Sequence, residues 1–376
     1  MTRRGRAVLA LGLVVYAVAW VFGSRALFPV SAGLVVAVAL AVGWVRLSAR
    51  RPIVRRRGPA RDAFEGDDVR MELDVEATSL VPPPTLVAIE RAAKLGERMI
   101  ELDRSGHGRY ELRSVPRGRY RFEPVRIRVE DPFGLARAEL AVGEDQALVV
   151  YPRLVALDRL FSEGGSHAQD GRRLLLRRPT GFELHSVRDY QQGESLRNVH
   201  WRSTAHRGAL MIKELEDAPR DEVCVLLDGM PARFDVAVRA AGSILQAHAR
   251  RARRCVLVVN SAAGEVQSAT DWRRTLEVLA AAEPTAPTPA FALLEGAGSP
   301  AARALELVVV TSRLDDALVD RLVQRALSRR GVSLVYLGDR DTRLLRLQSA
   351  GIAVAVIGVG DDLVAALSAR ERRVVA

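Results

Sequence analysis

The sequence predicts a mixed α/β protein with two transmembrane helices, a small antiparallel β-sandwich and a C-terminal, mostly parallel sheet covered by helices on both faces. Two long uncharged apolar runs open the chain, a region of period-two alternation follows, and short buried strands then alternate with helical segments. With 376 residues, 48% of them hydrophobic, the chain is long enough for two or three folded units. The expected regions are a hairpin with basic flanks over 1–57, a β-sandwich over 60–152, a linker with a polar motif over 153–219 and an α/β domain over 220–376.

The N-terminal hairpin rests on two uncharged runs, residues 7–23 and 26–45, which hold 17 and 20 residues. As helices, both runs are long enough to cross a hydrocarbon core of about 30 Å. Arginines precede the first run and follow the second, so both termini are expected on the cytoplasmic side of a cell membrane. These arginines are Arg3, Arg4, Arg6, Arg46, Arg50, Arg51, Arg55, Arg56 and Arg57.

The charge distribution argues for a membrane anchor and against nucleic acid as a partner. Residues 1–61 contain eleven arginines, and the first carboxylate is Asp62, so this segment accounts for the whole net charge of +11. A nucleic-acid-binding domain would carry a basic face of its own. We expect the arginine cluster after the second run to attract anionic lipid. A cleaved signal peptide ending near Ala17-Val18-Ala19 is the alternative, and the second apolar run argues against it.

The β unit is predicted from alternation of apolar and polar residues. Residues 69–77 and 120–130 alternate with period two, and 147–151 form a short apolar strand. The turn Asp131-Pro132-Phe133-Gly134 follows the second strand. Nothing in this unit indicates catalysis, and His107 is expected to be solvated in a glycine-flanked loop.

Residues 179–217 carry the densest cluster of polar side chains in the chain. The pattern predicts a strand over 182–190, a helix over 196–206 capped by Ser195 and ended by Gly208, and a strand over 210–215. Such density is typical of a hydrogen-bonded cluster or of a surface that receives a partner, and Trp201 suits either a core or an interface. The residues expected to bind a partner are Arg188, Asp189, Tyr190, Arg197, His200 and Trp201.

The run GFELHSVRDYQQGESLRNVHWRSTA, residues 181–205, resembles the signature of domain-of-unknown-function family 58. Residues 117–120 (RGRY) and 131–135 (DPFGL) match two further family elements in the same order, whereas Glu194, Thr204 and His206 depart from the usual Asp, Ser and Arg. The resemblance implies a von Willebrand factor A-like C-terminal domain. It also implies a MoxR-type AAA ATPase as partner, a transglutaminase-like membrane protein as a possible second partner, and a role in envelope-related assembly or chaperoning.

Asp228 is the candidate metal ligand. It follows the first predicted strand of the C-terminal sheet, and ligands of such sheets bind outside the carboxyl ends of the strands, where Thr311-Ser312 is also expected. In the von Willebrand A-like fold this position carries D-x-S-x-S, which binds a divalent cation through carboxylate and hydroxyl oxygens. Here Met230 and Ala232 replace the hydroxyls. The sequence therefore predicts a degenerate site and no cofactor, with capping of the following turn as the alternative role of Asp228.

We expect a non-enzymatic, membrane-anchored adaptor. The chain lacks the common phosphate-loop, zinc-protease and hydrolase motifs, and Cys224 and Cys255 are expected in core strands, not as a redox pair. Two alternatives remain open: a metal-assisted enzyme that uses Asp228 with His200 or His206, and a purely structural membrane organiser.

Overall fold

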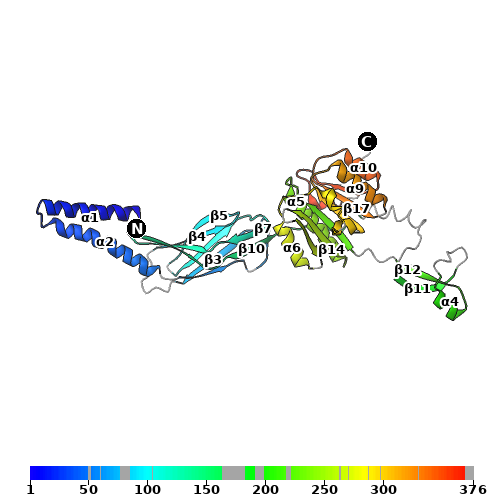
Figure 1. The fold of residues 1–376 in the computed structure, drawn as a ribbon, viewed down its shortest axis with the longest axis horizontal. Coiled ribbons are helices and arrows are strands. Elements are labelled where there is room, and N and C mark those ends of the chain that lie inside the picture. Colours follow the sequence, from blue (N-terminus) through cyan, green and yellow to red (C-terminus); the bar gives the residue numbers. More distant parts are fainter. Residues whose placement is uncertain are drawn as a thin grey trace. The chain divides into compact units, whose positions relative to one another are not determined.

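The computed structural model shows a mixed α/β protein with two N-terminal apolar helices and several sheets, one of them mostly parallel (Figure 1). The chain divides into two compact units, Met1–Tyr151 and Pro152–Ala376. The structure describes residues 1–49, 52–59, 61–76, 85–103, 105–162, 183–190, 199–216, 222–261, 264–269, 271–286, 288–296, 298–328 and 330–368.

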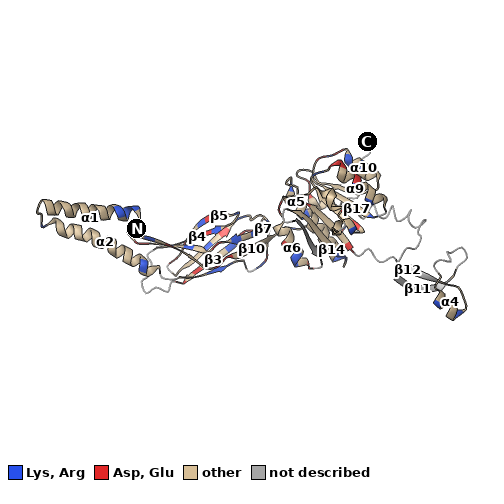
Figure 2. Ribbon diagram, in the orientation of Figure 1, with Lys and Arg blue, Asp and Glu red and all other residues tan. Residues whose placement is uncertain are grey.

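Helices α1 (Arg3–Val21) and α2 (Leu27–Ser48) are long and apolar enough to cross a membrane. Small residues let them approach closely: the Ser31 hydroxyl donates to the Gly12 carbonyl at 2.9 Å, and a Cβ at Gly12 would lie 3.2 Å from the Leu34 side chain. Figure 2 shows basic residues at the start of α1 and near the end of α2. The two helices therefore form an apolar hairpin with charge at its ends.

Two sheets make up the β unit, in the orders β1-β3-β6 and β2-β10-β7-β4-β8-β9, with β5 beside β4. They share buried clusters: Met71 of one sheet packs in a cluster with Phe122 of the other, and Leu73 with Ile127. Successive side chains of a strand point to opposite sides, so the alternation of apolar and polar residues places the apolar side chains of each strand on the face that packs against the other sheet. The strands are β1 (Ile53–Arg57), β2 (Ala63–Phe64), β3 (Val69–Glu76), β4 (Thr85–Ala92), β5 (Gly96–Glu101), β6 (His107–Leu112), β7 (Gly118–Phe122), β8 (Val125–Glu130), β9 (Arg137–Val142) and β10 (Gln146–Tyr151).

The single strand expected over 120–130 is wrong, because the segment forms two strands, β7 and β8, on either side of β4 in the sheet order. Glu123 and Pro124 separate them. Proline has no N–H to donate to a sheet ladder, so the chain leaves one ladder here and enters another.

Residues 53–57, assigned from sequence to the basic flank of the hairpin, form strand β1, which pairs antiparallel with β3. Its arginines make ion pairs with carboxylates of the β unit. The pairs are Arg55–Glu76 at 3.2 Å, Arg56–Glu90 at 2.5 Å and Arg57–Asp74 at 3.4 Å. These side chains thus serve strand pairing. Arg3, Arg4 and Arg6 lie at the start of α1, and Arg46 lies in the last turn of α2.

The α/β domain holds a six-stranded sheet of order β15-β14-β13-β16-β17-β18, in which β15 is antiparallel to β14 and the other neighbours are parallel. The antiparallel edge strand was not predicted. The strands are β13 (Glu222–Asp228), β14 (Arg254–Ser261), β15 (Gly264–Ala269), β16 (Glu306–Thr311), β17 (Gly331–Tyr336) and β18 (Ala353–Val356). The helices are α5 (Phe234–Arg250), α6 (Trp272–Ala281), α7 (Ala290–Leu293), α8 (Pro300–Arg303), α9 (Asp316–Leu327), α10 (Arg343–Ser349) and α11 (Leu363–Ser368).

Helices cover both faces of this sheet. Val223, Val225 and Leu227 of β13 lie in one core cluster, and the intervening Cys224 and Leu226 lie in another. The first cluster includes buried residues of α5, α6 and α11, and the second includes residues of α7, α8, α9 and α10. A strand buried on both faces explains why β13 reads as a continuous apolar run.

The polar motif forms the antiparallel pair β11 (Glu183–Asp189) and β12 (Met211–Glu216), with helix α4 (Trp201–Arg207) between them in the chain. The single helix predicted over 196–206 is wrong, because Val199 and His200 are not helical and His200 is the N-cap of α4; Leu196 lies outside the described residues. Gly208 ends the helix as expected, with φ of 68°. Ser195 lies outside the described residues.

Candidate functional site

Three polar residues lie at the carboxyl ends of three neighbouring strands of the α/β sheet: Asp228 is the last residue of β13, Thr311 the last of β16, and Asn260 the last but one of β14. In this sheet the chain first adds β14 on one side of β13 and later adds β16 on the other side, so the order of strand addition reverses between β13 and β16. At such a reversal the loops diverge, and open α/β sheets bind their ligands there. Asp228 and Thr311 therefore occupy the edge where the sequence placed a candidate site.

Hydrogen bonds join these three side chains. Asn260 Nδ2 donates to Asp228 Oδ1 at 2.9 Å, and Thr311 Oγ1 donates to Asp228 Oδ2 at 2.8 Å. All three residues are buried, with Asp228 4% exposed. Burial raises the pKa of the Asp228 carboxyl, and the hydrogen bonds from Thr311 and Asn260 oppose that rise. The carboxylate thus links β13 to both neighbouring strands, which the sequence did not predict.

The loops beside Asp228 are also fixed. Asn260 Nδ2 donates to the Thr288 carbonyl at 2.7 Å, and the Ala286 N–H donates to the Gly229 carbonyl at 3.1 Å. A Cβ at Gly229 would collide with the Asn260 carbonyl, so only glycine fits there. Ala286 and Thr288 are therefore held against this edge of the sheet.

Each Asp228 oxygen faces a side-chain donor, Asn260 Nδ2 at Oδ1 and Thr311 Oγ1 at Oδ2. Met230 and Ala232 bring no oxygen in their side chains. Within the described part of the chain, no group of three or more His, Cys, Asp or Glu could hold a metal ion.

His200, a candidate partner-binding residue, caps helix α4. The ring nitrogen Nδ1 of His200 accepts a hydrogen bond from the Ser203 N–H at 3.2 Å and lies 2.8 Å from Ser203 Oγ. The backbone N–H of His200 donates to the Met211 carbonyl at 2.8 Å. The Met211 N–H in turn donates to Thr204 Oγ1 at 3.0 Å. These bonds tie α4 to the start of β12, so His200 has a structural role in this motif.

Trp201 is the first residue of α4 and is 68% exposed. The sequence left open whether Trp201 lies in a core or at an interface, and this exposure shows that it is not a core residue. Tyr190 is half-buried, and its N–H donates to the Leu210 carbonyl at 2.9 Å. Arg188 and Asp189 lie on β11 opposite Ile212 and Met211. Their side chains, and the whole of Arg197, lie outside what the structure describes.

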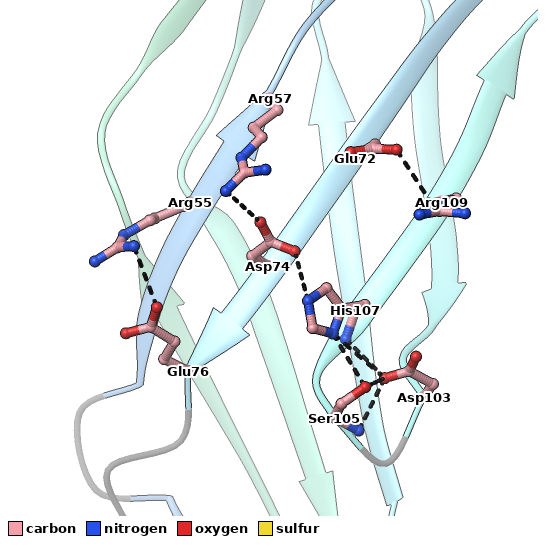
Figure 3. Close-up of polar contacts among 9 residues, drawn as sticks. All are labelled: Arg55, Arg57, Glu72, Asp74, Glu76, Asp103, Ser105, His107 and Arg109. Atoms are coloured by element: carbon pink, nitrogen blue, oxygen red, sulfur yellow. Dashed lines mark hydrogen bonds and ion pairs between the residues drawn. The ribbon is translucent and has the colours of Figure 1, made fainter.

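A second polar network, on β3, β6 and the turn before β6, was not predicted (Figure 3). His107 Nε2 lies 3.3 Å from Asp74 Oδ1, and His107 Nδ1 lies 3.0 Å from Ser105 Oγ. Ser105 Oγ donates to Asp103 Oδ1 at 2.7 Å, and this bond, with one from the His107 N–H, lowers the pKa of the Asp103 carboxyl. The sequence signal for the turn is the spacing Asp103-x-Ser105-x-His107.

This network does not have the geometry of a nucleophile and its base. A catalytic serine must direct its proton to the histidine, whereas the Ser105 proton points to Asp103. The His107 side chain is 59% exposed, as the sequence predicted, but the predicted loop is wrong, because His107 begins β6 and pairs with Asp74 of β3. Asp74 also forms an ion pair with Arg57 (Figure 3). The contacts therefore fasten β6 to β3 and β3 to β1.

Comparisons with known proteins agree with the motif. Residues 186–353 match the family described as "Protein of unknown function DUF58", which confirms the resemblance seen in the sequence. The chain is 26% identical over 255 residues to "Uncharacterized protein YeaD" of Bacillus subtilis (strain 168); this covers 65% of the chain and 62% of that protein.

Two solved structures share short regions with the chain. They are the PKD domain of the human VPS10 domain-containing receptor SorCS2 (19% identity, 28% of this chain, 77% of that chain, TM-score 0.20) and the CARDB domain of a Pyrococcus furiosus protein (15% identity, 28% of this chain, 92% of that chain, TM-score 0.20). Scores this low carry no information about the function of the chain.

Proposed function

The chain belongs to the DUF58 family through residues 186–353, and from this premise we propose that it is a non-enzymatic adaptor held at a cell membrane by α1 and α2. Its partner is a MoxR-type AAA ATPase, with a transglutaminase-like membrane protein as a second, and the complex serves envelope-related assembly or chaperoning. The YeaD relative, matched over 62% of its length, is itself uncharacterised, so its name adds nothing to this assignment.

The exposure of Trp201 carries the proposal. A large aromatic ring that stands 68% exposed on a helix capped at both ends is preorganised for contact, and tryptophan is among the residues that dominate binding energy at interfaces. Leu210 nearby in the motif is 40% exposed. Arg202 and Arg207 on the same helix give the surface a positive charge, which suits an acidic partner.

The proposal assigns a fold to each of the two units. In the first unit, the two sheets that share buried clusters support a β-sandwich. The buried carboxylate of Asp228 at the end of the first strand of the α/β sheet supports a von Willebrand A-like domain whose cation has been replaced by the side chains of Asn260 and Thr311.

Both termini lie on the cytoplasmic side in this proposal, because Arg3, Arg4, Arg6 and Arg46 flank the apolar helices. The same arginines attract anionic lipid headgroups. Protease added to intact cells is expected to leave a C-terminal epitope tag uncut and to cut it after the cells are opened. Cutting of the tag in intact cells would contradict this orientation.

The adaptor role is tested by pull-down of the detergent-solubilised chain with a co-expressed MoxR-type AAA ATPase. We expect Trp201→Ala to lose partner recovery and Leu327→Ala, at a 73% exposed position of the α/β domain, to keep it. Arg188→Ala and Arg197→Ala extend the test to the rest of the motif. Recovery equal to that of the unchanged protein in all three motif variants would rule out the motif as the docking surface. Loss only on deletion of residues 1–49, which removes α1 and α2 and keeps β1, would favour a structural membrane organiser.

A further inference from the structure

The turn between β8 and β9 is a preformed structure around a buried carboxylate. Asp131 is 4% exposed, and its side chain accepts hydrogen bonds from the N–H groups of Phe133 and Ala136, the first at 3.0 Å. The Gly134 N–H donates to the Asp131 carbonyl at 3.0 Å, and Gly134 has φ of 67°, which favours glycine. The backbone that carries Phe133 is therefore fixed.

This turn contacts the start of α1. The Thr2 N–H donates to the Leu135 carbonyl at 3.0 Å, and the Thr2 hydroxyl lies 2.6 Å from the Gly134 carbonyl. A Cβ at Gly5 would collide with the Leu135 carbonyl, so the helix approaches the turn as closely as backbone allows. The glycine at position 5 thus permits a contact between the first helical turn and the β unit.

The turn also contacts the end of α2. Leu135 and Ala136 share a buried cluster with Val38, Ala41 and Val45 of that helix. Val45 stands three residues before the last residue of α2, and Thr2 immediately precedes α1. The turn therefore packs against the C-terminal half of α2 and the start of α1, towards the end of the hairpin that lies opposite the link between the two helices.

Phe133 stands out from this fixed turn with 77% of its surface exposed, although its neighbours Leu135 and Ala136 are buried against the helices. Arg4 Nη1 lies 3.7 Å from the place of a Cβ on Gly134, where Glu130 Oε1 lies at 3.5 Å. Arg3 and Arg6 share the first turns of α1, and Arg46 lies in the last turn of α2. An exposed aromatic ring among arginines at the end of apolar helices is the pattern of a membrane-interface contact.

We propose that Phe133 inserts into the interfacial layer of the bilayer and that the arginines at the start of α1 and the end of α2 bind anionic lipid headgroups, so that the β8–β9 turn holds the β unit against the membrane. The occupant of this surface is lipid, because Leu135 and Ala136 of the same turn pack against α2, one of the two apolar helices. The inference rests on the proposed membrane anchoring by α1 and α2.

Nitroxide labels on single cysteines test the proposal in the full chain, reconstituted into vesicles of phosphatidylcholine and phosphatidylglycerol. The variants are Phe133→Cys, Met99→Cys and Leu40→Cys, each in a Cys224→Ala, Cys255→Ala background. Met99 is 67% exposed on β5 of the same unit, and Leu40 is 68% exposed on α2. Accessibility of each label to oxygen, which enters lipid, is compared with accessibility to a water-soluble nickel complex.

We expect the label at 133 to show a higher oxygen-to-nickel ratio than the label at 99 and a lower one than the label at 40. A ratio at 133 equal to that at 99, with a lipid-like ratio at 40, would overturn the lipid contact and leave the membrane anchoring standing. A water-like ratio at 40 would overturn the anchoring and the inference together. In vesicles of phosphatidylcholine alone the ratio at 133 is expected to fall, and an unchanged ratio would rule out the arginine–headgroup part of the proposal.

Discussion

Arg56 and Glu90 form an ion pair inside the β unit, with 2.5 Å between Arg56 Nε and Glu90 Oε1 and with side chains that are 5% and 3% exposed. Arg56 Nη2 also donates to the Glu123 carbonyl at 2.9 Å, and the guanidinium carbon lies 5.0 Å from the centroid of the Phe122 ring. Burial raises the pKa of the Glu90 carboxyl, and the Arg56 charge opposes that rise. An arginine that reads as part of a basic flank thus belongs to a core.

Replacing Arg56 by Met is expected to destabilise the β unit by about 3–5 kcal/mol, because it leaves a buried charge without its partner. Arg55→Met is the control: the Arg55–Glu76 pair is 61% and 54% exposed, and exposed pairs contribute about 0–1 kcal/mol. Hydrogen exchange of the β4 amides, followed by mass spectrometry in the full chain, measures the difference. Equal exchange in both variants would contradict a stabilising role for the buried pair.

Thr311→Val removes the hydroxyl that donates to Asp228 Oδ2 and leaves a buried carboxylate oxygen short of a donor. We expect a loss of about 1–3 kcal/mol in the stability of the α/β domain, seen as faster exchange of β13 and β16 amides. Ser312→Ala, at the next and half-buried position, is the control and is expected to change exchange less. Faster amide exchange in Ser312→Ala than in Thr311→Val would show that Thr311 does not stabilise this edge of the sheet.

Magnesium, manganese and zinc are expected to give no heat of binding in calorimetric titration and no rise in melting temperature. A ligand that binds only the folded state raises stability by RT ln(1 + [L]/Kd), so even weak binding at high metal concentration would be visible. A heat of binding that disappears in Asp228→Ala would contradict the proposal that the side chains of Asn260 and Thr311 occupy the place of a cation beside Asp228. It would also revive an enzyme that uses Asp228.

The stability of the α/β domain is expected to fall as the pH drops from about 6.5 to about 4, in part through His248. Burial lowers the pKa of His248 from 6.5 to about 4, and the nearby Arg253 charge adds to this. The unfolded chain then binds a proton that the folded chain excludes, so the stabilisation is complete above pH 6.5 and is lost as pH falls through the folded pKa.

The shift corresponds to about 3 kcal/mol. His248→Gln should therefore flatten the pH dependence of urea unfolding across this range, whereas His206→Gln, at an exposed position, should leave it as it is. Parallel pH profiles for the unchanged chain and His248→Gln would show that other groups account for the whole slope.

Cys255 is expected to alkylate slowly at neutral pH. Burial raises the pKa of its thiol from 9.0 to about 11, which reduces the thiolate fraction by about 100-fold, and the thiolate is the reactive form. Intact-mass measurement during iodoacetamide treatment tests this, with the Met99→Cys variant as the exposed control. Labelling of the native cysteines as fast as of position 99 would contradict the buried thiol.

Local patterns predicted most of the described elements, and contacts between distant segments account for the errors. The apolar runs around residues 7–45, the alternation in β3 and the buried run of β13 each depend on neighbours in the chain, and each was confirmed. Strand β1 was missed because IVRRR has little apolar alternation, and its arginines fit a strand only through carboxylates at residues 74, 76 and 90. The helix start at Trp201 depends in the same way on the bond between His200 and Met211.

The sequence by itself determined the apolar hairpin, the β region, the alternating α/β domain and the resemblance to the DUF58 family, because hydrophobic period and motif residues are local properties of a chain. Only the tertiary structure decided what the candidate residues do. Asn260 and Thr311, which lie 32 and 83 residues further along the chain, donate hydrogen bonds to the Asp228 carboxylate, the group that the sequence suggested as a candidate metal ligand. The exposure of Trp201 and Phe133 was decided in the same way, since burial depends on which distant segments pack against a side chain.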